Sequence, residues 1–155
     1  MARLRCHFTA QGRRENINGT IESRSSLSEG AMSVSNVQVG RDGQSPIAAI
    51  GDSLVVQEWS GSGPVYMHVH HADDEAWHVL AGVLRFRFAD AEIDAGPGTT
   101  IFVPAGTPHT YWEVEPSRYL IFLTPRLNRL IAELSAGADM AKVPEILARY
   151  DSAIC

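Results

Sequence analysis

The chain has 155 residues, of which 45% are hydrophobic and 20% are charged, and this composition fits one globular domain better than a disordered or fibrous chain. Thirteen basic against eighteen acidic residues give a formal net charge of -5, which argues against nucleic acid as a partner. No apolar stretch approaches the ~20 residues that cross a bilayer, and no secretory signal is recognisable, so we expect a cytoplasmic protein without a membrane partner.

Residues 1–31 are rich in arginine and serine, and they show neither a helical period nor a strand alternation. Such a segment lacks the regularly spaced apolar positions whose burial would offset the entropy of ordering it. We therefore predict a disordered N-terminal extension that the folded domain does not need.

The region from Ile47 to Phe122 contains short β-rich runs separated by Gly, Pro and Asp at close intervals, a pattern typical of an antiparallel all-β domain. We predict a β-barrel over residues 45–124, because the expected strands suffice to form one. These strands are 54–59, 65–70, 76–80, 83–88, 100–103, 109–114 and 119–123.

One of these strands alternates strictly between apolar and basic side chains. Leu84, Phe86 and Phe88 fall on one face, whereas Arg85 and Arg87 fall on the other. We expect the arginines to face solvent and the interior of the barrel to be apolar and partly aromatic.

The period becomes helical after Thr124, which can cap a helix that has Pro125 in its first turn and Gly137 beyond its end. The apolar positions of this helix form one stripe: Leu127, Leu130, Ile131 and Leu134. A second short helix is expected from Pro144. We predict that the helices of residues 125–155 pack on the outer face of the barrel.

Three histidines and one glutamate stand where their side chains can converge. His68 and His70 are two residues apart on an expected strand, so their imidazoles share a face about 6.5 to 7 Å apart. Glu75 begins the returning strand. His109 opens a strand after the rigid turn of residues 104–108, and it can approach from across the barrel.

Each of these residues alone has a structural explanation, because a single histidine on a strand is more often part of the core than a ligand. Burying three imidazoles and a carboxylate together in an apolar barrel is costly unless a cation compensates them. We therefore predict one divalent metal ion bound by His68, His70, Glu75 and His109. Nitrogen and oxygen ligands without thiolate suit Fe, Mn, Ni, Co or Zn, and spacing does not choose among them.

Aromatic side chains are expected to share the inward face with these ligands, by strand parity. They would form an apolar pocket for a small molecule, although ordinary core filling is the alternative. The expected pocket residues are Tyr66, Trp77, Phe86, Phe88, Tyr111 and, further along the strand of Tyr111, Glu113. Glu113 is either a second acid or base whose pKa is raised by apolar walls, or a solvated carboxylate at the barrel mouth.

Two segments resemble the sequence motifs of the cupin superfamily. Residues 63–82 run from Gly63 through the two neighbouring histidines and Glu75 to Gly82, and residues 98–109 end in Pro-Ala-Gly-Thr-Pro-His. The first glycine stands one residue closer to the histidines than is usual, and Glu113 replaces a common Asn.

The resemblance implies an all-β cupin fold, which is a double-stranded β-helix or jelly-roll barrel, with short C-terminal helices added here. It also implies a metal bound by three His and one Glu. The C-terminal pattern, Leu-Thr-Pro followed by a helix, resembles single-domain quercetin-dioxygenase-like cupins.

The function that follows is a metal-dependent dioxygenase that acts on a small apolar or aromatic molecule, with Glu75 as metal ligand and proton acceptor. Two alternatives stay open: a non-enzymatic small-molecule-binding or sensor protein, and a metal-dependent isomerase, which would need cationic groups facing inward. The resemblance further implies a homodimer formed through exposed sheet edges.

Overall fold

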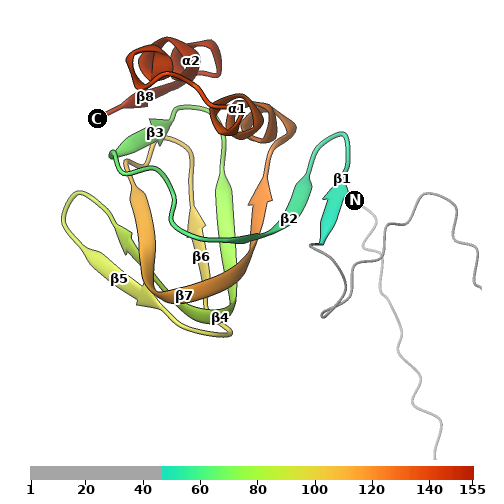
Figure 1. The fold of residues 1–155 in the computed structure, drawn as a ribbon, viewed down its shortest axis with the longest axis vertical. Helices are drawn as coiled ribbons and strands as arrows, with labels where there is room; N and C mark the ends of the chain where they lie inside the picture. The colour runs from blue at the N-terminus through green and yellow to red at the C-terminus, as the bar shows by residue number, and fades with distance from the viewer. Residues whose placement is uncertain (1–46) are drawn as a thin grey trace, which may run out of the picture. The chain divides into compact units, whose positions relative to one another are not determined.

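A computed structural model describes residues 47–155 of the chain (Figure 1). The predicted extension, residues 1–31, lies outside these residues, as do the first two residues of the predicted barrel. The strands are β1 Ala48–Ile50, β2 Val55–Ser60, β3 His68–His70, β4 Glu75–Arg87, β5 Glu92–Ala95, β6 Thr100–Val103, β7 Thr110–Leu123 and β8 Ser152–Ile154. The helices are α1 Pro125–Ser135, the short 3-10 helix η1 Met140–Lys142 and α2 Val143–Arg149.

Two antiparallel sheets form the folded domain. The larger sheet has the order β1-β2-β7-β4-β5, with β6 also paired to β4, and the smaller sheet pairs β3 with β8. The prediction of an antiparallel, mostly β domain is confirmed. The sheets of residues 47–155 do not close into a continuous barrel, because β3 forms no ladder with the larger sheet. It is joined to the segment before β7 by an isolated bridge between His68 and His109 and by a hydrogen bond from the N–H of Gly106 to the carbonyl oxygen of His70.

The two longest strands are each continuous where the sequence predicts two shorter ones. β4 continues through Gly82, which has a φ of 72° and lies so close to the backbone of Pro116 that an added Cβ would collide with it. The pairing of β4 with β7 shifts register between Val79 and Leu84. Gly82 and Pro116 therefore mark bulges that bend the strands, because a bulge tolerates a residue outside the regular ladder.

The side of β4 that faces the interior is as predicted. Leu84 and Phe86 are fully buried, and Phe88 beyond the strand end is partly buried. Arg85 lies on the outer side, where its Nε and Nη2 donate to the Asp94 carboxylate at 2.5 and 2.7 Å. Asp94 belongs to β5, a strand that the sequence analysis missed because its residues are mostly polar and exposed.

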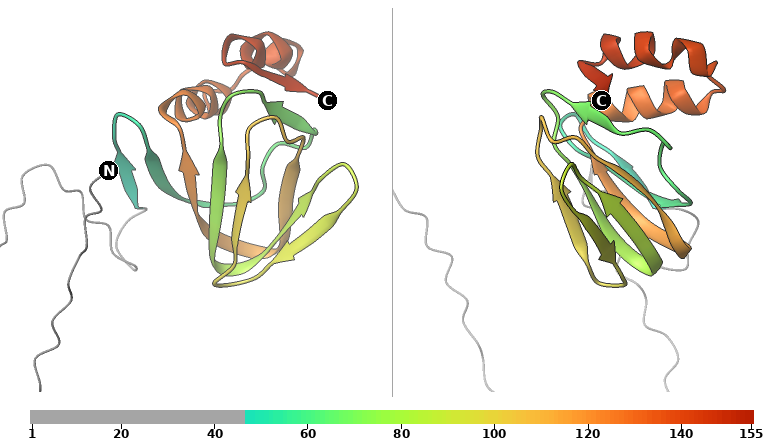
Figure 2. Two further views of the ribbon diagram at one scale, coloured as in Figure 1. Left: turned by 180° about the vertical axis from the view of Figure 1, so that it is seen from behind. Right: turned by 90° about the vertical axis from the view of Figure 1, so that its left-hand side faces the viewer.

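The helices begin and end where the sequence predicts. Thr124 caps α1 by accepting a hydrogen bond from the backbone N–H of Leu127, and Gly137, with a φ of 92°, follows the helix end. α2 contains Pro144 in its first turn. The two helices pack against the core of the domain through buried leucines, which are Leu127, Leu130 and Leu147. Figures 1 and 2 show them together at one end of the larger sheet, beside β3 and β8.

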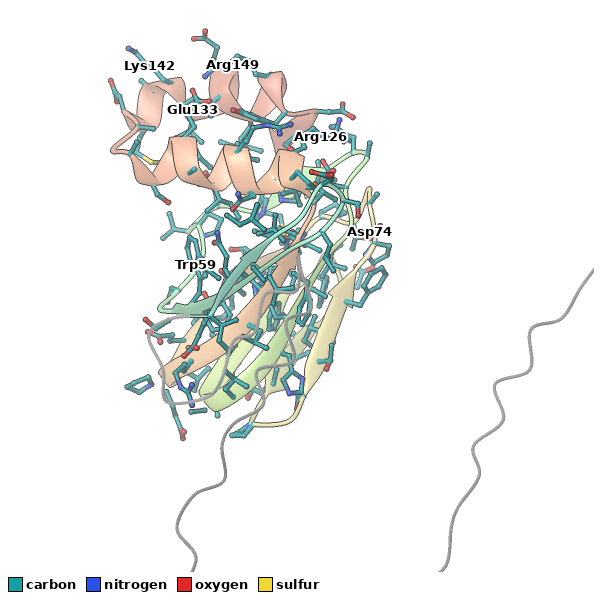
Figure 3. All side chains as sticks on the ribbon, turned by 90° about the vertical axis from the view of Figure 1, so that its right-hand side faces the viewer. Trp59, Asp74, Arg126, Glu133, Lys142 and Arg149 are labelled. Atoms are coloured by element: carbon teal, nitrogen blue, oxygen red, sulfur yellow. The ribbon has the colours of Figure 1, made fainter. Side chains whose placement is uncertain are left out.

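The two helices are held to each other by polar contacts as well as by buried leucines. Arg149 of α2 donates a hydrogen bond to Glu133 of α1, and both residues are labelled in Figure 3. The Tyr150 hydroxyl donates to the other oxygen of Glu133 at 3.0 Å. None of the helices in the described residues is long and apolar enough to cross a membrane. A single chain does not test the predicted homodimer, which stays a prediction.

Candidate metal centre

The four predicted ligands come together from three segments of the chain. His68 and His70 are the first and last residues of β3, Glu75 is the first residue of β4, and His109 directly precedes β7. The backbones of His68 and His109 exchange hydrogen bonds of 3.0 and 2.9 Å, which fixes the distance between the two predicted motifs. One potential ligand atom of each residue lies within 4.8 Å of all the others. The four side chains can thus hold one metal ion.

The loop between His70 and Glu75 is fastened on both sides. The carboxylate of Asp73 is buried and accepts hydrogen bonds from the Thr124 hydroxyl and from Nε of Arg126, each 2.7 Å long. Asp74 accepts the backbone N–H of Ala105 at 2.8 Å. Figure 3 shows Arg126 and Asp74 at the same end of α1. These contacts tie the first motif to both the helix and the turn that precedes His109.

The ligand atoms are buried without conventional partners. The four residues are between 1% and 6% exposed. Oε1 of Glu75 lies 2.6 Å from Nε2 of His109 and 3.2 Å from Nε2 of His70. Glu75 Oε1 and His109 Nε2 nevertheless have no hydrogen bond of acceptable geometry. Buried polar atoms are normally satisfied, so a cation at this point would supply the missing interaction.

Hydrogen bonds on the far side of the imidazoles orient the rings. Nδ1 of His109 lies 2.9 Å from the carbonyl oxygen of Thr107, and Nδ1 of His68 lies 3.4 Å from that of Tyr66. A carbonyl oxygen can only accept, so both Nδ1 atoms carry the proton. The lone pair of Nε2 is then free to bind a metal, which is the usual arrangement of histidine ligands.

The pKa values of the cluster describe a buried anion among imidazoles. Burial lowers the pKa of His68 to about 4, and the nearby His109 and His70 add to this shift. For Glu75, burial raises the pKa, but contacts with His109 and His70 outweigh it and lower the pKa to about 2. For His109, burial lowers the pKa, but the contact with Glu75 outweighs it and raises the pKa. The lowered pKa keeps Glu75 ionised, which is the form in which a carboxylate binds a metal ion.

A cavity of about 260 Å³ adjoins the cluster. Among the predicted pocket residues, Tyr66, Trp77 and Tyr111 line it. Phe86 lies outside the lining because it packs behind, in contact with Trp77 and stacked on Tyr111 at ring-centroid distances of 5.0 and 5.3 Å. Phe88 is partly buried against the core and also lies outside the lining.

Glu113 does not line the cavity either. Its Oε1 accepts hydrogen bonds from the backbone N–H of Gly61 at 3.0 Å and from the backbone N–H and hydroxyl of Ser117 at 2.7 and 2.8 Å. The hydrogen bonds from Ser117 lower the pKa of Glu113, which is the opposite of the shift expected for a buried acid or base. Glu113 braces a turn at the sheet end.

Much of the cavity wall consists of residues outside the predicted pocket. Trp59 and Ile121 contribute from the larger sheet, whereas the helices contribute one apolar group: Leu130, Ile131, Leu134 and Leu147. The apolar stripe of α1 was visible in the sequence, but nothing in the spacing indicated that it faces the ligands. Ser152 was also missed, although its hydroxyl lies 2.8 Å from Nδ1 of His70.

A comparison with known protein families supports the predicted resemblance. The cupin-domain family model matches residues 53–123. This match supports a place in the cupin superfamily, which the two motifs predicted, and the cupin match includes all four clustered residues. No curated protein matches the chain.

Several solved structures are similar to part of this chain. They include a cupin-2 domain containing protein from Shewanella frigidimarina, at 25% identity over 51% of this chain and 78% of that one, with a TM-score of 0.46. KdgF from Halomonas sp. shares 21% identity over 53% and 79%, with a TM-score of 0.46. The polyketide cyclase RemF from Streptomyces resistomycificus shares 26% over 48% and 56%, with a TM-score of 0.42. The finer resemblance to quercetin-dioxygenase-like cupins gains no support here.

We predict that protein purified without chelators carries about one metal ion per chain and that His109→Ala removes it. The substitution should weaken metal binding by at least about tenfold, because even the outer partners of metal ligands are worth 10–100-fold in affinity. His78→Ala is the matched control, since His78 lies on the outer side of β4 beside Thr100. Elemental analysis checks the metal content. Equal content in wild type and His109→Ala would contradict the assignment.

Proposed function

We propose that the protein is a metal-dependent oxygenase that acts on a small, uncharged, apolar or aromatic molecule. The observation that carries this proposal is the buried cluster of three imidazoles and one carboxylate at the wall of an apolar cavity. Histidine and carboxylate ligands with open coordination positions are typical of non-haem iron oxygenases.

The residues that would hold the ion are His68, His70, Glu75 and His109. When bound, a divalent ion with an open coordination position supplies a site for dioxygen or for a chelating oxygen of the substrate. Fe, Mn, Ni, Co and Zn all suit these ligands. The work of the chain is to fix the imidazoles by their Nδ1 hydrogen bonds and to keep the surroundings apolar.

The cavity wall favours an uncharged substrate. Aromatic rings cover one part of it and the aliphatic side chains of α1 and α2 cover another. No lysine or arginine is present among the described residues that line it. A phosphate or carboxylate group would therefore lose its hydration without gaining a cation.

The isomerase alternative is weakened by the outward position of Arg85, which lies on a strand of the larger sheet. Arg85 is paired with Asp94 on the outer side of the sheet and does not reach the cavity. A substrate such as a sugar phosphate would find no partner of this kind inside. A sensor protein would bind its small molecule in the same pocket. It would differ from an oxygenase in that the bound molecule is not converted.

Glu75 is the group that we assign as proton acceptor. Among the described residues that line the cavity, it carries the single carboxylate. A general base must lie within hydrogen-bond reach of the proton that it removes, and Glu75 meets the cavity directly. Trp77 packs against His109, and Tyr111 packs against Trp77, so aromatic rings surround this buried carboxylate on one side.

An oxygen electrode tests the proposed reaction. Protein reconstituted with iron, manganese, nickel or cobalt is mixed with neutral catechols, diketones and flavonols, and oxygen uptake is recorded. We expect metal-dependent uptake with at least one of these classes and none with Glu75→Gln. His78→Ala should keep wild-type rates. Tight binding of metal and ligand without uptake would contradict the oxygenase and favour the sensor.

We also predict that α1 sets the size of the cavity. Ile131→Phe adds an aromatic ring to the lining and should weaken the binding of a neutral catechol by about tenfold or more, because misfits of methylene size already cost 10–200-fold. Ala132→Phe adds the same ring on the neighbouring, exposed position of the helix and should leave binding unchanged. Quenching of tryptophan fluorescence measures both affinities. Equal affinities would show that α1 does not line the ligand site.

A further inference from the structure

His70 differs from the other two histidines of the cluster in what holds its ring. Backbone carbonyl groups accept from Nδ1 of His68 and His109, whereas Nδ1 of His70 meets the hydroxyl of Ser152 at 2.8 Å. Ser152 is 3% exposed and belongs to β8, far from both cupin motifs in the sequence. One side chain of the C-terminal strand therefore touches the metal centre.

The direction of this hydrogen bond follows from a second one. The Ser152 hydroxyl donates to the carbonyl oxygen of Tyr150 at 3.1 Å. A hydroxyl has one proton, so Oγ of Ser152 must accept from Nδ1–H of His70. This direction places the proton of His70 on Nδ1 and leaves the lone pair of Nε2 facing Glu75 Oε1, which is 3.2 Å away.

The backbone around Ser152 is arranged to keep the hydroxyl in this place. β8 pairs with β3 so that Ser152 is opposite His70, and the N–H of His71 donates to the carbonyl oxygen of Asp151 at 2.9 Å. Asp151 has a φ of 53°, and it is the one non-glycine residue with positive φ that is found in residues 47–155. A left-handed residue of this kind persists only where its surroundings enforce it.

We propose that Ser152 is a positioning residue of the metal centre, whose hydroxyl selects the Nδ1–H form of His70 and so makes its Nε2 a metal ligand. The inference rests on metal binding by the four-residue cluster, which is part of the proposed function, but not on the oxygenase reaction. It makes the C-terminal strand a component of the site, beyond the two cupin motifs.

The neighbourhood of His70 explains why the hydroxyl matters. Without it, Nδ1 would be buried with no acceptor, because His70 is 6% exposed. The proton would gain a partner by moving to Nε2, where Glu75 Oε1 can accept it. An Nε2–H group cannot bind a metal, so the alternative form competes directly with the ion.

The test compares wild type, Ser152→Ala and Ser152→Thr as full chains freed of metal. Cobalt(II) is titrated calorimetrically, and the visible absorption of the bound cobalt is recorded. We expect Ser152→Ala to bind cobalt about 10–100-fold more weakly, as other losses of outer partners do, with a changed spectrum. Ser152→Thr keeps the hydroxyl and should restore both. Ser117→Ala removes another buried hydroxyl, which donates to Glu113, and should bind like wild type.

The position of the proton is read separately in the metal-free protein. Nitrogen-15 NMR of the imidazoles should find the His70 proton on Nδ1 in wild type and on Nε2 in Ser152→Ala. Melting curves without metal identify a variant that fails to fold, in which case Ser152→Thr and the wild-type NMR decide. Wild-type cobalt affinity and spectrum in Ser152→Ala, or an Nε2–H form of His70 in wild type, would overturn the proposal. Absence of cobalt binding in wild type would overturn the metal site as well.

Discussion

The convergence of one carboxylate and three imidazoles in a buried cluster is the constraint on which the rest of the structure depends. Glu75 and the histidines around it are almost fully buried, and two of their polar atoms have no hydrogen-bond partner. Leaving such atoms unmatched costs free energy of the order of ~1–3 kcal/mol for each group. A divalent cation would remove this cost, and the cluster could hold one such ion.

The fold holds these four residues from several directions. The bridge between His68 and His109 fixes one pair of ligands, and the carboxylates of Asp73 and Asp74 fasten the loop between the others. The C-terminal residues complete this support. Thr124, the cap of α1, donates a hydrogen bond to Asp73, and Ser152 of β8 contacts Nδ1 of His70. The C-terminal segment therefore has two roles. Apolar residues of α1 and α2 form part of the cavity wall, and polar contacts from the same segment hold the metal-binding residues in place.

The sequence was sufficient to predict that four candidate ligands converge, and it predicted most strand positions. Spacing of two residues on a strand, a proline-rich turn before His109 and the strict alternation around Phe86 all have local causes that a sequence displays. Gly82 was misread as a strand break, because whether a glycine ends a strand or bends it depends on the partner strand. Three features depend on contacts between distant segments of the chain. They are the side of the sheet that α1 covers, the hydrogen bonds of Glu113 to Gly61 and Ser117, and the contact of Ser152 with His70. No local pattern carries these contacts.

X-ray absorption at the zinc edge, on protein reconstituted with zinc, tests the central claim most directly, because it observes the ligands rather than their consequences. The account predicts only nitrogen and oxygen neighbours at about 2.0–2.2 Å, with the outer scattering of three imidazoles. At zinc concentrations high enough to load the weakened site, His109→Ala should lose one imidazole from this pattern. A sulfur neighbour at about 2.3 Å, or a spectrum without imidazole scattering, would contradict the assignment of His68, His70, Glu75 and His109 as the metal centre.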